Sequence, residues 1–325
     1  MRSINMYEDF IKAIDKSNSI CIISHQNPDG DTCGSSLALY RALKLYGKTQ
    51  VGIFCDSDFR ESLKVLDGID EYNKCEIAKF DMAIACDCAE KERMGEYYAL
   101  FTKAKYRADI DHHKTNDFYG NINYVEAGVS ATCEVMYKII KALDEIKPCL
   151  DDTVAKLLYS GLVTDSGGFT FSSVSSQTHK IASQLIKYNF SASAICEHFL
   201  KSVSINTFKL RARVLSNAKF FEDNKIGIIV FNKEDFESTG TSGNDTEGAI
   251  NYIRDIDGVE IAVAISHTDK ANSYKISIRT SDRVDASKIA MTFGGGGHKN
   301  AAGGRLSGFL EDVKDKLLKA CRDEL

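Results

Sequence analysis

The chain has 325 residues, of which 43% are hydrophobic and 27% are charged, and its formal net charge is −5. These values are ordinary for a globular protein, and the length allows two domains, each with its own core. The acidic balance argues against a basic surface that grips long duplex nucleic acid, but it is compatible with nucleotides or short oligonucleotides held at a local site. No run approaches the ~20 apolar residues of a membrane span, so we expect a cytoplasmic protein without a membrane partner.

The ten cysteines are scattered along the chain and form no C-x-x-C pair. Most of them fall within apolar strand or helix patterns. This distribution is typical of reduced, buried thiols in a reducing compartment, so we expect neither disulfides nor a cysteine-ligated metal.

An amphipathic helix is expected at 1–14, followed by a short β-branched strand at 19–23. The next stretch, S-H-Q-N-P-D-G-D-T-C-G-S, leads into a helical pattern, so the order is strand, loop, helix. In open α/β sheets, ligands bind at the carboxyl ends of the strands. His25, Asp29 and Asp31 lie within seven residues at such an end and suit one or two divalent cations. A solvated loop with no ligand is the alternative for this motif taken alone.

Two later strands also end in aspartate or histidine residues. The near-continuous apolar run at 80–86 ends in Asp87, and the strand at 106–110 ends in Asp111, His112 and His113. Uniformly apolar strands are typical of parallel sheets buried on both faces. A β-α-β-α-β order places all three strand ends at one edge, and the sequence therefore predicts a metal site there.

The remaining elements of the first half continue the α/β alternation. Strands are expected at 49–55 and 121–126, and helices are expected after residue 58 as far as Leu66 and at 90–101, 130–142 and 152–162. The last of these helices runs into Asp165, which two glycines at 167 and 168 would present at a sharp turn. Helices expected at 177–188, 192–200 and 205–215, without a Pro/Gly-rich linker, predict a stiff boundary between domains.

From residue 219 the pattern changes to strands, at 226–231, 258–267 and 273–279, with helices at 245–254, 285–291 and after 308. Four consecutive glycines at 294–297 are expected to form a loop, neither helix nor strand, whose backbone N–H groups approach a ligand closely. We expect the small residues after His298 to begin a helix with a positive N-terminus suited to phosphate. A flexible linker is the alternative.

Together these motifs resemble the DHH/DHHA1 phosphoesterases, which are named for the triplet found here at 111–113. The four DHH motifs occur in order, and the second signature is matched by R-T-S at 279–281 and by G-G-G-G-H-K-N-A-A-G at 294–303. The resemblance implies an α/β fold with a DHH domain at 1–190 built on a mainly parallel sheet, a helical linker at 191–218, and a smaller DHHA1 domain at 219–325. The size is most similar to the branch of bifunctional oligoribonucleases and pAp phosphatases.

The resemblance also implies roles for individual residues. One Mn²⁺ would be held by His25, Asp29 and Asp87, and a second by Asp31, Asp87, His112 and Asp165, with Asp87 as the bridge. Asp111 would orient His112, and His113 would face the substrate phosphate. The phosphate-binding residues of the second domain would be Arg279, Ser281, Gly295, Gly296, Gly297 and His298.

The residues themselves support a pair of cations, because four carboxylates at one edge would otherwise repel one another and raise their own pKa values. Carboxylate and imidazole ligands without thiolate favour Mn²⁺ over a structural Zn²⁺ site, while Mg²⁺, Co²⁺ and Fe²⁺ stay open. We expect two cations to activate a water for in-line attack on phosphorus.

The expected substrates are short RNA oligonucleotides, cleaved to mononucleotides, and 3'-phosphoadenosine 5'-phosphate (pAp), cleaved to AMP. Three alternatives remain: a phosphodiesterase for cyclic di-AMP or pApA, a manganese pyrophosphatase, and a catalytically silent nucleotide-binding regulator. A homodimer is compatible with the sequence, which does not define the oligomeric state.

Overall fold

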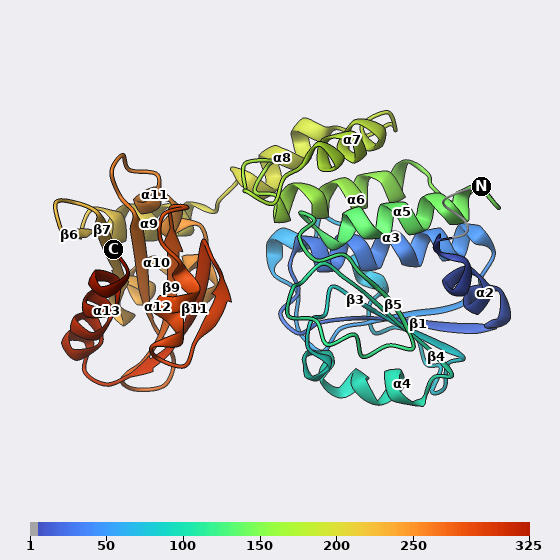
Figure 1. Cartoon of the computed structure of the whole chain (residues 1–325), viewed down its shortest axis with the longest axis horizontal. Coiled ribbons are helices and arrows are strands. Elements are labelled where there is room, and N and C mark those ends of the chain that lie inside the picture. Colours follow the sequence, from blue (N-terminus) through green and yellow to red (C-terminus); the bar gives the residue numbers. More distant parts are fainter. Residues whose placement is uncertain (1–5) are drawn as a thin grey trace. The chain divides into compact units, whose positions relative to one another are not determined.

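The computed structural model describes residues 6–325. The chain forms two compact units, which divide between Ser202 and Val203 (Figure 1). Of the helix expected at 1–14, residues 1–5 lie outside the described part of the chain, and the helix there is α2 (Glu8–Lys16). Its buried side chains, such as Phe10 and Ile14, join the core of the first unit.

The first unit contains a five-stranded sheet in the order β2-β1-β3-β4-β5, and every neighbouring pair is parallel. The strands are β1 (Ser19–Ser24), β2 (Gln50–Phe54), β3 (Met82–Cys86), β4 (Tyr106–Asp111) and β5 (Ile122–Val125). The predicted α/β fold with a parallel sheet is confirmed. Since β1 is flanked by β2 on one side and β3 on the other, the strand order reverses there, and such switch points are where α/β sheets bind ligands.

Helices cover both faces of this sheet. The helices after α2 are α3 (Gly30–Tyr46), α4 (Tyr98–Lys103), α5 (Thr132–Asp144), α6 (Asp152–Asp165), α7 (Ser176–Leu185) and α8 (Ala192–Leu200), of which α7 and α8 pack on α6 rather than on the sheet. Helices α3, α5 and α6 lie on one side of the sheet and α4 on the other (Figure 1). Alternate residues of β1 enter the two cores, Ile20 and Ile22 on one face and Cys21 and Ile23 on the other. Burial on both faces explains the continuous apolar runs of the strands.

Two helix predictions in the first unit were wrong. The segment expected to be helical as far as Leu66 contains only the short 3-10 helix η1 (Glu61–Leu63), and a second one, η2 (Ile69–Glu71), follows it. The buried residues Leu63, Leu66 and Ile69 of this stretch recur every third residue, which matches the 3-10 rather than the α-helical period.

The helix expected at 90–101 is instead the 3-10 segment η3 (Lys91–Tyr97) followed by α4. Gly95 breaks it with φ 56°, a left-handed value that favours glycine. A Cβ at this position would lie 1.9 Å from Asp56 Oδ2, so the close approach also requires glycine.

The helices on either side of the division belong to different units. Helix α8 packs on α6, whereas α9 (Ile205–Leu215) packs on α10 (Lys233–Thr239) and α11 (Ala249–Arg254). The segment expected as a helical linker, 191–218, therefore includes one helix of each unit.

The second unit is built on a six-stranded mixed sheet in the order β10-β11-β9-β8-β7-β6. Its strands are β6 (Lys219–Phe221), β7 (Ile226–Phe231), β8 (Ile261–His267), β9 (Ser273–Thr280), β10 (Gly296–His298) and β11 (Ala301–Ser307). Only β7 and β8 pair in parallel. Helices α12 (Ala286–Met291) and α13 (Leu310–Glu324) share a core with one face, and α9 to α11 share a smaller core with the other. The helix expected at 245–254 is split into η4 (Gly243–Thr246) and α11 by Gly248, whose φ is 79°.

The glycine-rich segment differs from its prediction. Residues 296–298 form β10, which pairs antiparallel with β11, so no helix begins after His298 and the expected helix N-terminus is wrong. Part of the glycine run is also strand, contrary to expectation. The reason is space: a Cβ on Gly297 would lie 2.5 Å from the carbonyl oxygen of Ala301, and one on Gly303 would lie 2.4 Å from that of Ile276. Glycine is here the residue that lets three strands approach.

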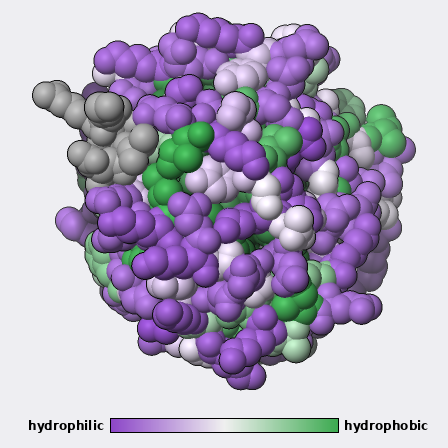
Figure 2. Space-filling view, turned by 90° about the vertical axis from the view of Figure 1, so that its right-hand side faces the viewer, coloured by the Kyte–Doolittle hydropathy of each residue, from purple (hydrophilic) through white to green (hydrophobic). Residues whose placement is uncertain are grey.

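All ten cysteines are free thiols, and all except Cys75 and Cys196 are buried, as expected. Within residues 6–325, no helix is both long and apolar enough to cross a membrane. The face shown in Figure 2 is mainly hydrophilic, with hydrophobic residues in small separate groups.

Candidate metal centre

The carboxyl ends of β1, β3 and β4 bring histidine and aspartate side chains together at one edge of the first sheet. Three groups of potential ligand atoms each lie within 4.8 Å of one another. They are His25, Asp29 and Asp87; Asp31, His112 and Asp165; and Asp87, His112 and His113. All six residues expected as metal ligands thus lie in this cluster, to which Asp165 comes from the end of α6. Their role as ligands stays a prediction.

Asp87 occupies the middle of the cluster. Its carboxylate Oδ2 lies 3.7 Å from His25 Nε2, and its Oδ1 lies 3.7 Å from both His112 Nε2 and His113 Nδ1. Its φ of 57° is unusual for a non-glycine residue, although aspartate tolerates it better than most. The backbone N–H of Asp87 donates to the carbonyl of Ile110 at 2.9 Å, which anchors this turn to β4.

Two threonine hydroxyls hold the Asp87 carboxylate. Thr132 donates to Oδ1 at 2.8 Å, and Thr32 donates to Oδ2 at 2.7 Å. The Thr32 hydroxyl is also 3.0 Å from Asp29 Oδ1 and 2.8 Å from His25 Nε2. One hydroxyl proton cannot satisfy two carboxylates, whereas a divalent cation could bind both together with the imidazole. The first donor group therefore fits a cation.

Helix α3 begins within the cluster because Asp29 is its N-cap and accepts hydrogen bonds from the backbone N–H groups of Asp31 and Thr32, both at 3.0 Å. Asp31 in turn accepts backbone hydrogen bonds from Thr132 at 2.6 Å and Cys133 at 2.9 Å, at the start of α5. Burial, and then the charge of Asp87, raise the pKa of Asp31 to about 7.

Asp165 reaches Asp31 because α3 and α6 cross closely. A Cβ on Gly34 would lie 2.7 Å from the carbonyl oxygen of Leu157, and one on Gly161 would lie 2.9 Å from Asp31 Oδ1. Burial raises the pKa of Asp165, and the charges of neighbouring acids, with Asp31 the largest, add to this effect. Raised pKa values of two neighbouring carboxyls indicate an acidic site that lacks enough positive charge. The second donor group, Asp31, His112 and Asp165, therefore also fits a cation.

The two histidines of the triplet have different partners. His112 Nδ1 donates to the carbonyl of Val129 at 3.1 Å, which leaves Nε2 as the nitrogen directed at Asp165, 3.3 Å away. His113 Nδ1 is 2.7 Å from Asp111 Oδ1. The expectation that Asp111 orients His112 was therefore wrong. Asp111 accepts the backbone N–H of His112 at 2.7 Å and orients the ring of His113.

Burial lowers the pKa of His113, but the hydrogen bond with Asp111 and the charge of Asp87 raise it overall. Asn116 supports this arrangement by donating to Asp111 Oδ2 at 2.7 Å and to Asp109 at 3.2 Å. His113 is thus an imidazole held by a buried carboxylate that favours its protonated form.

Sequence reasoning missed Arg93 as well as Asn116, Thr32 and Thr132. Arg93 Nη2 lies 2.8 Å from His25 Nδ1 and 3.3 Å from the carbonyl of Gln26. The signal that could have found Thr32 is its position three residues after the N-cap Asp29, where the first turn faces the same loop. Arg93 gave no comparable signal because its position depends on the irregular segment before Gly95.

The residues expected to bind phosphate lie in the second unit. His298 is in register with Ala301, and Ala301 with Arg279, so Arg279 and His298 share one face of the sheet with a small residue between them. The Ser281 hydroxyl instead donates to the carboxylate of Glu260. Desolvation lowers the pKa of Arg279, and the nearby Glu247 opposes this.

The glycines of this segment differ in the space around them. A Cβ on Gly295 would lie 2.3 Å from the carbonyl oxygen of Gly303, whereas Gly296 faces open space. Gly297 is enclosed by β11, as described above. Of the three, Gly296 leaves the most room for a ligand beside its backbone.

The fold and these residues define a phosphoesterase of the DHH type. Residues 19–162 match the DHH family, N-terminal domain, and residues 225–325 match the DHHA1 domain. The chain belongs to the DHH/DHHA1 phosphoesterase family, as the motifs indicated, and it is a hydrolase by class.

Individual relatives are similar over most of this chain. The bifunctional oligoribonuclease and PAP phosphatase NrnA of Thermus thermophilus is 29% identical, covering 99% of this chain and 94% of the relative. The cyclic-di-AMP phosphodiesterase PdeA of Listeria monocytogenes is 25% identical, covering 94% of this chain and 48% of that protein. A solved exopolyphosphatase-related protein from Bacteroides fragilis superposes with a TM-score of 0.89 at 26% identity, covering 97% of this chain and 95% of that one.

Proposed function

We propose that this chain is a Mn²⁺-dependent phosphoesterase that hydrolyses short RNA oligonucleotides to mononucleotides and pAp to AMP. The observation that carries the proposal is the position of Asp87, whose two carboxylate oxygens face histidines from β1 and β4 on either side. The name of the Thermus relative supports the choice of substrates.

Six residues would hold two divalent cations, with Asp87 shared between them. They are His25, Asp29, Asp31, Asp87, His112 and Asp165. When bound, such cations supply Lewis acidity and lower the pKa of water toward neutrality. The donor set of carboxylates and imidazoles suits Mn²⁺, and Mg²⁺ or Co²⁺ are the alternatives.

The protein's own groups would position the substrate and stabilise charge. His113, whose pKa is raised by the hydrogen bond with Asp111, would donate a hydrogen bond to a non-bridging phosphate oxygen, where negative charge grows during attack on phosphorus. Arg279 and His298 would bind a substrate phosphate on the second sheet, with Ser281 and the backbone of residues 295–297 beside them.

The test is product analysis with Mn²⁺ present on a 5'-labelled and a 3'-labelled trinucleotide, run beside pAp, pApA, cyclic di-AMP and a 24-mer. We expect mononucleotides from the trinucleotides and AMP from pAp, and the two labels give the direction of attack. Degradation of the 24-mer alone would contradict the proposal.

A second candidate is a phosphodiesterase for cyclic di-AMP or pApA, which the similarity to PdeA favours. The same panel separates the two candidates. Turnover of pApA or cyclic di-AMP well above that of pAp and trinucleotides would favour the second candidate.

A further inference from the structure

One face of the second sheet carries a row of cations beyond the expected phosphate site. Along β9, Arg279, Ser277 and Lys275 are two residues apart and point to the same face, because side chains alternate along a strand. On β11, Ala301, Gly303 and Arg305 are in register with them, in that order. We call these six residues the open face.

Within the described part of the chain, α11 contacts β9, but no residue of the open face belongs to either core of this unit. The intervening residues of β9, such as Ile276 and Ile278, are buried in the core with α12 and α13 on the opposite side. The core formed with α9 to α11 takes residues from β7 and β8, such as Ile229 and Ala264, and none from β9 or β11. Lys275 and Arg305 are accordingly exposed.

Lys275 and Arg305 are directly opposite each other on neighbouring strands. Like charges in such a pair destabilise a sheet. Neither side chain has a hydrogen bond or ion pair with any residue from 6 to 325, whereas Arg322 and Arg283 of the same unit are paired with Glu222 and Glu260. Folding therefore gains nothing from this pair of charges, and an anionic ligand would relieve their repulsion.

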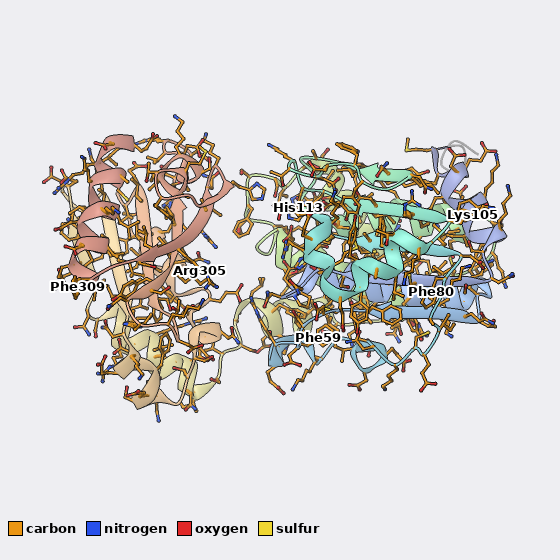
Figure 3. The ribbon with its side chains drawn as sticks, turned by 90° about the horizontal axis from the view of Figure 1, so that it is seen from below. Phe59, Phe80, Lys105, His113, Arg305 and Phe309 are labelled. Atoms are coloured by element: carbon orange, nitrogen blue, oxygen red, sulfur yellow. The ribbon has the colours of Figure 1, made fainter. Side chains whose placement is uncertain are left out.

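We propose that the open face binds the phosphate backbone of single-stranded RNA beyond the phosphate held by Arg279 and His298. This rests on the proposed function and deepens it, since it makes oligonucleotides preferred over pAp. Successive positions of the open face along β9 are spaced by about 6.8 Å, so Lys275 lies about 14 Å from Arg279. Gly303 and Ala301 leave room between the cations, and Figure 3 shows where Arg305 lies on its strand.

The experiment measures binding of a fluorescent RNA pentanucleotide by anisotropy, in EDTA to prevent hydrolysis, across a series of salt concentrations. The variant is Lys275→Gln with Arg305→Gln. For single strands each lost phosphate contact reduces the slope of log affinity against log salt by about 0.7, so we expect a decrease of about 1.4 and about tenfold weaker binding at low salt. Turnover of pAp with Mn²⁺ should stay within about twofold, since pAp is too short to reach this pair.

The matched control is Lys316→Gln with Lys319→Gln, which removes two exposed cations from α13 on the opposite side of the sheet. Its slope should equal that of the unmodified chain. An unchanged slope in the Lys275 and Arg305 variant, or an equal loss in the control, would overturn the inference while leaving the proposed function intact. Conversely, a chain that binds the pentanucleotide with the expected slope but hydrolyses neither RNA nor pAp would overturn the proposed function alone.

Discussion

At the carboxyl edge of the first sheet, Asp31 and Asp165 lie among other acids, whereas on the second sheet Lys275 and Arg305 are exposed cations opposite each other. Each region gathers side chains of like charge, carboxylates in the first and cations in the second. The first is buried and has converging donor atoms, which suits small cations. The second is exposed on one face of a sheet, which suits an extended anion. The sign of the charge and the degree of burial thus distinguish the proposed site of hydrolysis from the proposed binding surface.

In this comparison, the largest loss of activity is expected from a substitution of Asp87 in the first region. We expect Asp87→Asn to reduce turnover of pAp and trinucleotides by at least about 10³-fold, because it removes the carboxylate charge proposed to bridge the two cations. Initial rates at saturating Mn²⁺ measure the loss, and titration with Mn²⁺ should show weaker binding. Asp58→Asn, which changes an exposed acid after β2, is the control and should keep full activity. Full activity of the Asp87 variant would rule out its bridging role.

Substitutions of His113 and its partner Asp111 distinguish the stabilisation of charge on the substrate from metal binding. Loss of a charged hydrogen-bond donor to developing charge, which the neutral amide of glutamine does not replace, should lower kcat of His113→Gln by about 10²- to 10³-fold, with little change in KM. Asp111→Asn should move the alkaline limb of the pH–kcat profile to lower pH, because Asp111 raises the pKa of His113 and only its protonated form carries the charge. Steady-state kinetics across pH gives both values. His198→Gln, whose ring contacts Ser62 on the surface, should match the parent.

The second unit should respond in KM rather than in kcat. Arg279→Gln removes a charged hydrogen-bond donor to phosphate, and we expect KM for pAp to rise about 10- to 100-fold while kcat changes little. Arg283→Gln provides the matched control, because Arg283 is paired with Glu260. A loss confined to kcat would mean that Arg279 acts in the chemical step and not in substrate binding. The expected difference between the two regions would then be wrong.

The position of a site residue could be predicted from the sequence where the hydrophobic periodicity of a helix or strand determines it. Asp87 and His112 follow apolar strands of a parallel sheet, and the ends of parallel strands share an edge, so their convergence could be predicted. Arg93 could not, because its position depends on the left-handed turn at Gly95. The β10–β11 hairpin was missed for a related reason: consecutive glycines have no side-chain pattern, and only the packing against β9 shows that they form a strand.

The smallest expected effect concerns the stability of the first unit without metal. Burial and the charge of Asp87 raise the pKa of Asp31 to about 7, and burial and the charge of Asp31 raise the pKa of Asp165. Both acids therefore bind protons more tightly in the folded chain than in the unfolded chain. The free energy of unfolding consequently falls as pH rises from about 4 to about 7. Burial lowers the pKa values of His112 and His113, but nearby acids raise them overall, so stability from their charged forms is also lost as pH rises.

Asp29 and Asp111 do not reverse this trend. Desolvation opposes their ionisation, but His25 for the first and His113 for the second lower their pKa values overall. Such groups lose their contribution only when pH falls below about 4, outside the range of interest.

We therefore expect Tm of the EDTA-treated chain to fall by about 3 to 10 °C from pH 5 to pH 8, and Mn²⁺ to raise Tm more at pH 8 than at pH 5. Differential scanning calorimetry at both pH values measures this. Asp31→Asn should flatten the decline, because it removes one of the two acids responsible. A Tm of the metal-free chain that rises over this interval would mean that the acids at the edge of the first sheet are already compensated, and the contrast with the open face would fail.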